Sequence, residues 1–263
     1  MLVTLKKEAL FESRTLTATR MLDELTNITE NIRRGRYAKA PVVFLAGSLV
    51  RGEGTSTSDL DLVIVFDRLP NAFRESFWHE KWPVEAFVHD PSTLEYFFRT
   101  IDRPTGFPSL AAMVSEGIEV PAVSAFSNRL KQLANKILDE GPPKWSEHEI
   151  KNSRYQITDL IEDMRDPRSP HELHATASSL YPALANHYFR SRGLWSAKGK
   201  TIPRRLSQID PRLANQFVDG FSEVFVKNCN RAVISLAEEI LAPEGGFLFA
   251  GYKLEALKLW RVE

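Results

Sequence analysis

Two aspartates separated by a single residue stand at the start of an apolar segment of this sequence. Asp59 and Asp61 belong to the run DLDLVIVF over residues 59–66, whose β-branched residues predict a strand. Side chains two residues apart on a strand point to the same side, with Cα atoms about 6.5 Å apart. Two carboxylates placed in this way repel each other unless a cation lies between them. Hard oxygen ligands suit Mg²⁺, which also favours phosphate oxygens, so the pair predicts a magnesium site.

A Gly-Ser step precedes this segment and supplies groups that suit a phosphate. Residues 42–46 (VVFLA) predict a short buried strand, which ends at Gly47 and Ser48. Glycine allows the backbone to approach an anion closely, and the amides of a following helical turn, with the Ser48 hydroxyl, would donate hydrogen bonds to it. The glycine-containing loop that follows allows the two strands to lie side by side. The segment therefore predicts a triphosphate site.

A third carboxylate would complete a two-metal arrangement, in which ions about 3.5–4 Å apart stabilise the attacking and leaving oxygens. Glu85 is the candidate, because it interrupts the apolar segment PVEAFV over residues 83–88. It could ligate a metal ion or accept the proton of an attacking hydroxyl. Asp90 and Glu95 are the alternative acids.

The elements that would position these residues form an α+β domain. Met21, Leu25, Ile28 and Ile32 recur at helical spacing and lead into the basic run RRGR over residues 33–36. The sequence also predicts a helix over about 71–79, a strand over 84–89, a helix that begins at residues 91–92 with Ser92 as its N-cap, and a helix over about 122–140.

The second half of the chain predicts helices alone. The breaker Gly141-Pro142-Pro143 separates a catalytic domain over 1–141 from an all-α helical bundle over 142–263. Apolar residues at helical spacing mark three of its helices: Ile157, Leu160, Ile161 and Met164; Leu173, Ala177, Leu180, Leu184 and Tyr188; and Ala232, Val233, Leu236 and Ile240. The predicted fold is a small mixed β-sheet with flanking helices, followed by a helical bundle.

The motif GS–RGEG–SDLD, at residues 47–48, 51–54 and 58–61, with Glu85 on a later strand, resembles the nucleotidyltransferase superfamily related to DNA polymerase beta. The domain plan resembles that of the kanamycin and lincosamide nucleotidyltransferases. The resemblance implies transfer of a nucleoside monophosphate from a nucleoside triphosphate to an acceptor, with two Mg²⁺ ions. It implies these roles: metal binding and catalysis by Asp59, Asp61 and Glu85, and nucleotide binding by Gly47, Ser48, Arg51 and Ser58.

A basic segment in the second half offers a further phosphate contact. Between Arg190 and Ile209 there are six basic residues and no acidic one. Lys198 or Lys200 could neutralise a leaving pyrophosphate, as such reactions require. A solvated basic loop explains the same residues equally well.

Composition limits the class of acceptor. Lys plus Arg equals Asp plus Glu, at 34 each, so a nucleic-acid acceptor is not favoured. The resemblance in domain plan implies a small hydroxylated molecule, such as an aminoglycoside or lincosamide, as the first choice. A protein or tRNA acceptor, or a non-catalytic nucleotide-binding module such as half of a toxin–antitoxin pair, is the alternative. The oligomeric state is not predicted.

Location is predicted from what the sequence lacks. One cysteine excludes an intramolecular disulfide. The apolar stretches are too short to span a membrane, and residues 1–8 do not read as a signal peptide. We therefore expect a cytoplasmic protein without a membrane partner.

Overall fold

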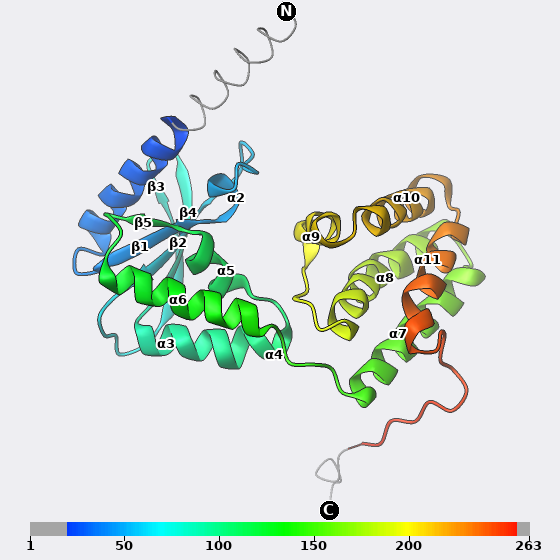
Figure 1. The fold of residues 1–263 in the computed structure, drawn as a ribbon. Helices are drawn as coiled ribbons and strands as arrows, with labels where there is room; N and C mark the ends of the chain where they lie inside the picture. The colour runs from blue at the N-terminus through cyan, green and yellow to red at the C-terminus, as the bar shows by residue number, and fades with distance from the viewer. Residues whose placement is uncertain (1–19, 257–263) are drawn as a thin grey trace, which may run out of the picture. The chain divides into compact units, whose positions relative to one another are not determined.

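The computed structural model describes residues 20–256, which divide into two compact units (Figure 1). Unit 1 contains the chain up to Pro104 and residues Pro108–Glu140, whereas unit 2 contains Thr105–Phe107 and the chain from Gly141 onward. The prediction about a signal peptide at residues 1–8 lies outside the described residues. No helix of residues 20–256 combines the length and apolar character needed to cross a membrane.

Unit 1 is built on a mixed five-stranded sheet with the order β3-β4-β2-β1-β5. β2 and β4 are parallel, and every other neighbouring pair is antiparallel. The strands are β1 (Val42–Ala46), β2 (Leu60–Val65), β3 (Phe73–His79), β4 (Trp82–His89) and β5 (Ile118–Val120). The α+β class is confirmed, and the three predicted strands correspond to β1, β2 and β4, the last of which begins two residues earlier than predicted.

The two faces of this sheet have different roles. Residues 20–36 are helical, and Leu25 and Ile32 of this helix belong to one buried cluster with Leu62, Ile64 and Ala86 of the central strands. Because side chains alternate along a strand, Asp61 and Glu85 belong to the opposite face. The acidic residues are therefore separated from this core cluster by the sheet itself.

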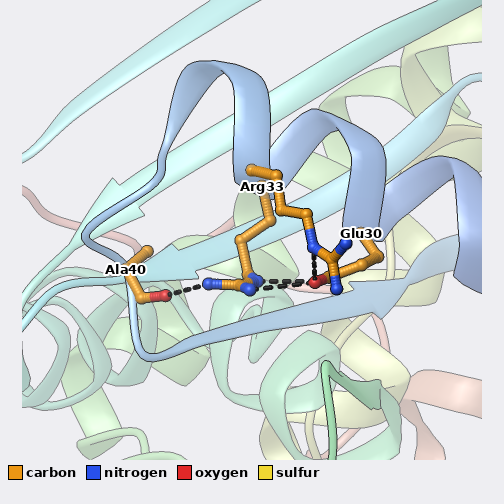
Figure 2. A network of polar contacts seen from close by, with 4 residues as sticks. Glu30, Arg33 and Ala40 are labelled. Atoms are coloured by element: carbon orange, nitrogen blue, oxygen red, sulfur yellow. Dashed lines mark hydrogen bonds and ion pairs between the residues drawn. The ribbon is translucent and has the colours of Figure 1, made fainter.

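A polar network fixes the connection between the first helix and β1 (Figure 2). Arg33 donates to both carboxylate oxygens of Glu30, at 2.6 and 2.9 Å, and Arg34 donates to the same carboxylate at 2.6 Å. The remaining guanidinium nitrogen of Arg33 donates to the carbonyl of Ala40 at 3.0 Å. Hydrogen bonds from Arg33, followed by those from Arg34, lower the pKa of Glu30 to about 2 despite its burial. The network therefore holds the chain just before β1, the strand that leads to Gly47.

The helix predicted over residues 71–79 is wrong, because this segment forms β3 and pairs with β4. His79 lies opposite Trp82, so Glu80 and Lys81 make a two-residue hairpin turn. Glu80 has a φ of 54°, which hairpin turns of this length require but which glycine or asparagine normally supplies. The turn lacks the usual sequence signature, and the backbone hydrogen bonds of β4 decide the conformation.

The N-cap predicted for the next helix is also wrong. The cap of α3 (Pro91–Tyr96) is Asp90, whose carboxylate accepts from the amide of Thr93 at 2.8 Å while the Thr93 hydroxyl accepts from the amide of Asp90. Proline at the first helical position places the cap at the residue before it. The chain continues as a π-helical stretch over Phe97–Asp102, then α4 (Arg103–Thr105), α5 (Ser109–Glu116) and α6 (Ala125–Glu140). The helix predicted from residue 122 therefore starts three residues later.

Every helix or strand that the described residues of unit 2 form is a helix, as predicted. Its α-helices are α7 (Glu147–Arg165), α8 (Pro170–Ser191), α9 (Ile202–Ile209), α10 (Pro211–Lys227) and α11 (Arg231–Leu241), with short 3₁₀ turns at Gly199–Thr201 and Ala242–Glu244. The predicted apolar stripes supply much of a single buried core, which includes Ile161, Leu180 and Leu236. Helices that share one apolar core in this way form a bundle.

Arg190 of α8 holds two connecting segments within unit 2. Its side chain donates to the carbonyl of Pro143 at 3.1 Å and packs against Gly106, whose carbonyl accepts from the amide of Ser196 at 2.8 Å. Arg190 is 3% exposed, and its burial lowers the pKa of the guanidinium. The contacts explain why residues 105–107 belong to unit 2 although their neighbours in the chain belong to unit 1.

Candidate active site

Three carboxylates meet at the start of β2 and β4. Asp61 lies directly opposite Glu85 in the parallel register of these strands, and Asp59 immediately precedes β2. Ligand atoms of Asp59, Asp61 and Glu85 all lie within 4.8 Å of one another, and all three residues are partly buried. We call this group the acidic triad. The structure therefore brings together the three acids that the sequence singled out, from segments about 25 residues apart.

Gly47 lies against the acidic triad. Ala46, the last residue of β1, is paired with Asp61, and the single-turn helix α2 (Gly47–Val50) starts at the next residue. Gly47 has a φ of +81°, and a Cβ atom added to it would lie 1.9 Å from Oδ2 of Asp61. Glycine was predicted here for close approach to a phosphate. The structure shows a second reason, because the Asp61 carboxylate occupies the space of a side chain.

Ser48 and Ser58 lie together at the base of the loop that joins α2 to β2. The Ser48 hydroxyl donates to the Ser58 hydroxyl at 3.3 Å, and the Ser58 hydroxyl accepts from the amide of Thr55 at 2.8 Å. The carbonyl of Ser48 accepts from the amide of Glu53 at 2.8 Å. These contacts fold the loop back on itself. They bring Ser58, which precedes β2, next to Ser48 of α2. Their role in nucleotide binding stays a prediction.

Of the other predicted phosphate contacts, one has ion-pair partners and two belong to unit 2. Arg51 forms ion pairs with Glu53 at 3.1 Å and with Glu116 at 3.3 Å. Lys198 and Lys200 are exposed residues of unit 2, and the Lys198 ammonium lies over the ring of Phe107, 5.4 Å from its centroid. Nucleotide binding by these three residues stays a prediction.

The alternative acids Asp90 and Glu95 have structural partners of their own. Asp90 is 6% exposed and accepts from the amide of Leu69 at 2.9 Å in addition to capping α3. Burial raises its pKa, but hydrogen bonds from the amides of Thr93 and Leu69 outweigh that effect and hold the pKa below its usual value. Glu95 accepts from Arg99, one helical turn away, at 2.8 Å. Neither acid belongs to the group of possible metal ligands found around Glu85.

Arg74 is a member of the site that the sequence did not reveal. It lies on β3 opposite Phe87, and its guanidinium forms an ion pair with the Glu85 carboxylate. The same guanidinium lies over the ring of Phe87, 4.9 Å from the centroid. Because residues 71–79 were predicted as a helix, nothing placed Arg74 beside Glu85. Phe73 and Phe77, four residues apart, fit one face of a helix as well as one face of a strand, so their spacing could not identify the strand.

The donor set fits a hard divalent cation. Three carboxylates with ligand atoms within 4.8 Å of one another, beside a position where only glycine fits, make a compact oxygen-rich seat. Mg²⁺ binds through a few carboxylates and completes its shell with water and substrate phosphates. The acidic triad could therefore hold a metal ion of this class.

Comparison with known proteins agrees with this geometry. Residues 34–103 match the family model described as "Nucleotidyltransferase domain". The chain contains a nucleotidyltransferase domain. The match spans Gly47, Arg74 and the whole acidic triad, and it lies within unit 1. The resemblance to nucleotidyltransferases that the sequence motif indicated is thus confirmed. Nucleotidyl transfer is the general activity of this domain.

Other comparisons are more distant. A solved structure of a nucleotidyltransferase-like protein from Exiguobacterium sibiricum 255-15 is similar at 13% identity, with a TM-score of 0.41, over 82% of this chain and 75% of that one. No curated protein sequence matches the chain.

Proposed function

We propose that this chain is a magnesium-dependent enzyme that transfers a nucleoside monophosphate from a nucleoside triphosphate to a hydroxyl of a small molecule. The observation that carries the proposal is the acidic triad beside Gly47 and Ser48, within the matched domain. Asp59, Asp61 and Glu85 hold the metal, and Ser48 with the neighbouring amides binds the distal phosphates. When Mg²⁺ is bound, it neutralises negative charge on the phosphates.

The transfer is a displacement at the α-phosphorus. The acceptor hydroxyl oxygen forms a bond to this phosphorus while the bond to the oxygen that bridges to the β-phosphate breaks, and pyrophosphate leaves with that electron pair. The hydroxyl proton passes to a carboxylate oxygen of the triad, for which Glu85 is the candidate. The chain's own residues thus orient the reactants and accept one proton.

The charge balance and the domain plan favour a small acceptor. The whole chain carries equal numbers of acidic and basic residues, whereas a surface that binds several nucleic-acid phosphates is normally basic. Because the domain plan resembles that of the kanamycin and lincosamide nucleotidyltransferases, the acceptor we propose is a hydroxylated small molecule of the aminoglycoside or lincosamide type.

The test is a transfer assay with each of the four α-labelled nucleoside triphosphates, Mg²⁺ and a mixture of acceptors that includes kanamycin and lincomycin. Mass spectrometry detects the expected gain of one nucleoside monophosphate on a small molecule. Label on the protein or on added tRNA would instead move the acceptor to another class. Pyrophosphate release that Asp61→Asn does not reduce, or binding of nucleotide without any release, would contradict the proposal.

A further inference from the structure

Arg74 is tied to a carboxylate that the proposed reaction needs for metal binding. Its guanidinium pairs with Glu85, a member of the acidic triad, and is the basic group that the structure shows paired with this carboxylate. The side chain of Arg74 is 58% exposed and that of Glu85 is 27% exposed. The ion pair is thus open to solvent on the arginine side and can exchange its partner without unfolding the strand.

A metal ion and this guanidinium compete for the same acid. A divalent cation on Glu85 would lie close to the positive charge of Arg74, and like charges at such a distance repel strongly. Arginine remains charged at any working pH, so the conflict cannot be relieved by loss of a proton. The ion pair uses Oε1 of Glu85, and a metal ion on the same carboxylate would weaken it through charge repulsion, which favours release of Arg74 from Glu85.

The structure provides a place for the released guanidinium. Arg74 already lies over the ring of Phe87, two residues along β4 from Glu85 and on the same face. This cation–π contact holds the guanidinium beside the site while its hydrogen-bond donors become free. The movement required is the rotation of one exposed side chain.

The order of the strands indicates what the freed donors would meet. Across the sheet, the sequence of groups is Gly47 and Ser48 after β1, then Asp61 on β2, Glu85 on β4 and Arg74 on β3. A triphosphate with its distal phosphates at Ser48 and its α-phosphate over the triad would extend from β1 toward β3. The α-phosphate is then the phosphate nearest to Arg74.

We propose that Arg74 exchanges its partner during the cycle: it neutralises Glu85 in the metal-free site and binds an α-phosphate oxygen once metal and nucleotide are bound. This inference rests on the proposed function. A guanidinium is well suited to the second role, because its paired N–H donors match the oxygens of a phosphate group. The exchange would also link metal binding to nucleotide binding, since the nucleotide offers Arg74 a new anion.

The exchange predicts effects of opposite sign in a single variant. Arg74→Met removes the competitor of the metal, so the variant binds Mn²⁺ alone about two- to fivefold more tightly than wild type, the range of an exposed ion pair. The same variant lacks a charged donor to the α-phosphate, so it binds the metal–nucleotide complex about tenfold more weakly. Loss of fold alone would weaken both.

The measurements use Mn²⁺ binding followed by electron paramagnetic resonance, and calorimetry with Mn²⁺ and the α,β-methylene analogues of ATP, GTP, CTP and UTP, which cannot release pyrophosphate. Arg36→Met is the matched control. Arg36 pairs at 2.5 Å with Glu75, which lies on β3 next to Arg74 but outside the triad. It should leave both affinities within about twofold of wild type. Arg74→Lys keeps the charge without the paired donors and should recover part of the loss in nucleotide affinity.

The outcomes separate this inference from the proposed function. If wild type binds none of the four analogues in the presence of Mn²⁺, the proposed function itself fails. If wild type binds metal and an analogue while Arg74→Met leaves both affinities unchanged, or shifts them in the same direction, the partner exchange is overturned and the proposed function stands.

Discussion

At Gly47 the backbone has a φ of +81°, and the space beside its Cα is filled by the Asp61 carboxylate. Two costs therefore meet at one residue. A side chain would be strained by the backbone conformation, and it would push Asp61 out of the triad. Gly52, five residues later, has a φ of +70° but nothing within 4 Å of an added Cβ. Substitution of Gly52 would therefore cause backbone strain alone, whereas substitution of Gly47 would also displace the proposed metal ligand Asp61.

We expect Gly47→Ala to abolish tight Mn²⁺ binding and transfer, whereas Gly52→Ala retains both. Each substitution costs about 1–2 kcal/mol of stability through the left-handed backbone conformation. Only Gly47→Ala adds a clash with Asp61. Thermal denaturation measures the shared cost, and Mn²⁺ titration measures the difference. Equal Mn²⁺ affinity in the two variants would show that Gly47 is needed only for its backbone conformation and not to leave space for Asp61.

The carboxylates at 59 and 61 provide the second prediction at this scale. Asp59→Asn and Asp61→Asn should each lower transfer by roughly 10²- to 10³-fold or more, the loss seen when one preorganised electrostatic contact is removed. Asp59→Asn should not lower the melting temperature, because one of several crowded like charges has been removed. Glu95→Gln, an acid of the same domain outside the triad, is the control and should retain full activity. Near-wild-type transfer in both asparagine variants would place the metal elsewhere.

At the scale of elements, Asp90 connects three segments. It follows β4, caps α3 and accepts from the amide of Leu69 in the loop before β3. These hydrogen bonds stabilise the ionised carboxylate, which is why its pKa is lowered although burial opposes ionisation. The free energy that the ionised form contributes is present above the unfolded pKa, about 3.9, and is lost as the pH falls through the lower folded value.

Asp90→Asn should therefore destabilise the protein by about 1–2 kcal/mol at pH 7, because an amide keeps one acceptor oxygen where the carboxylate uses two, for Thr93 and Leu69. The difference from wild type should shrink as the pH falls below about 4, because the unfolded carboxyl then binds a proton that the folded carboxyl, with its lower pKa, does not yet bind. Urea unfolding at a series of pH values measures this difference. Asp67→Asn is the control, because Asp67 is exposed and lies in the loop before β3 that contains Leu69. A difference that stays constant down to pH 3.5 would mean that charge has no part in the cap.

At the scale of the whole molecule, each unit contains a buried histidine whose pKa is strongly lowered. Burial lowers the pKa of His89 in unit 1 to about 4, although Asp90 opposes the shift. Burial also lowers the pKa of His187 in unit 2 to about 4, with Glu244 opposing. His187 is fully buried, with Nδ1 3.0 Å from the Ser153 hydroxyl. Both histidines are therefore neutral in the folded protein near pH 7.

Both units should lose stability as the pH falls from about 6.5 to about 4. In this window the unfolded histidine binds a proton that the folded one does not, so unfolding becomes more favourable, and the loss is complete below the folded pKa. His89→Gln and His187→Gln should each reduce the slope of unfolding free energy against pH, and the double variant should reduce it by the sum. His171→Gln, at an exposed position, is the control. An unchanged slope in both single variants would contradict the prediction.

The sequence alone identified the acidic triad, the Gly-Ser step and the α+β plan, because these depend on local patterns. Alternation along residues 59–66 sets which side chains share a face, and helical spacing marks the stripes of unit 2. The cap at Asp90 was also within reach, since Pro91 at the first helical position indicates it.

Other features depended on the tertiary structure. Residues 73–79 form a strand because β4 supplies backbone hydrogen-bond partners across a turn without glycine or asparagine. That pairing alone brings Arg74 to Glu85. Residues 105–107 join unit 2 because their contacts there outweigh their position in the chain. Local patterns determine which residues can do chemistry, whereas contacts between distant segments decide which of them meet.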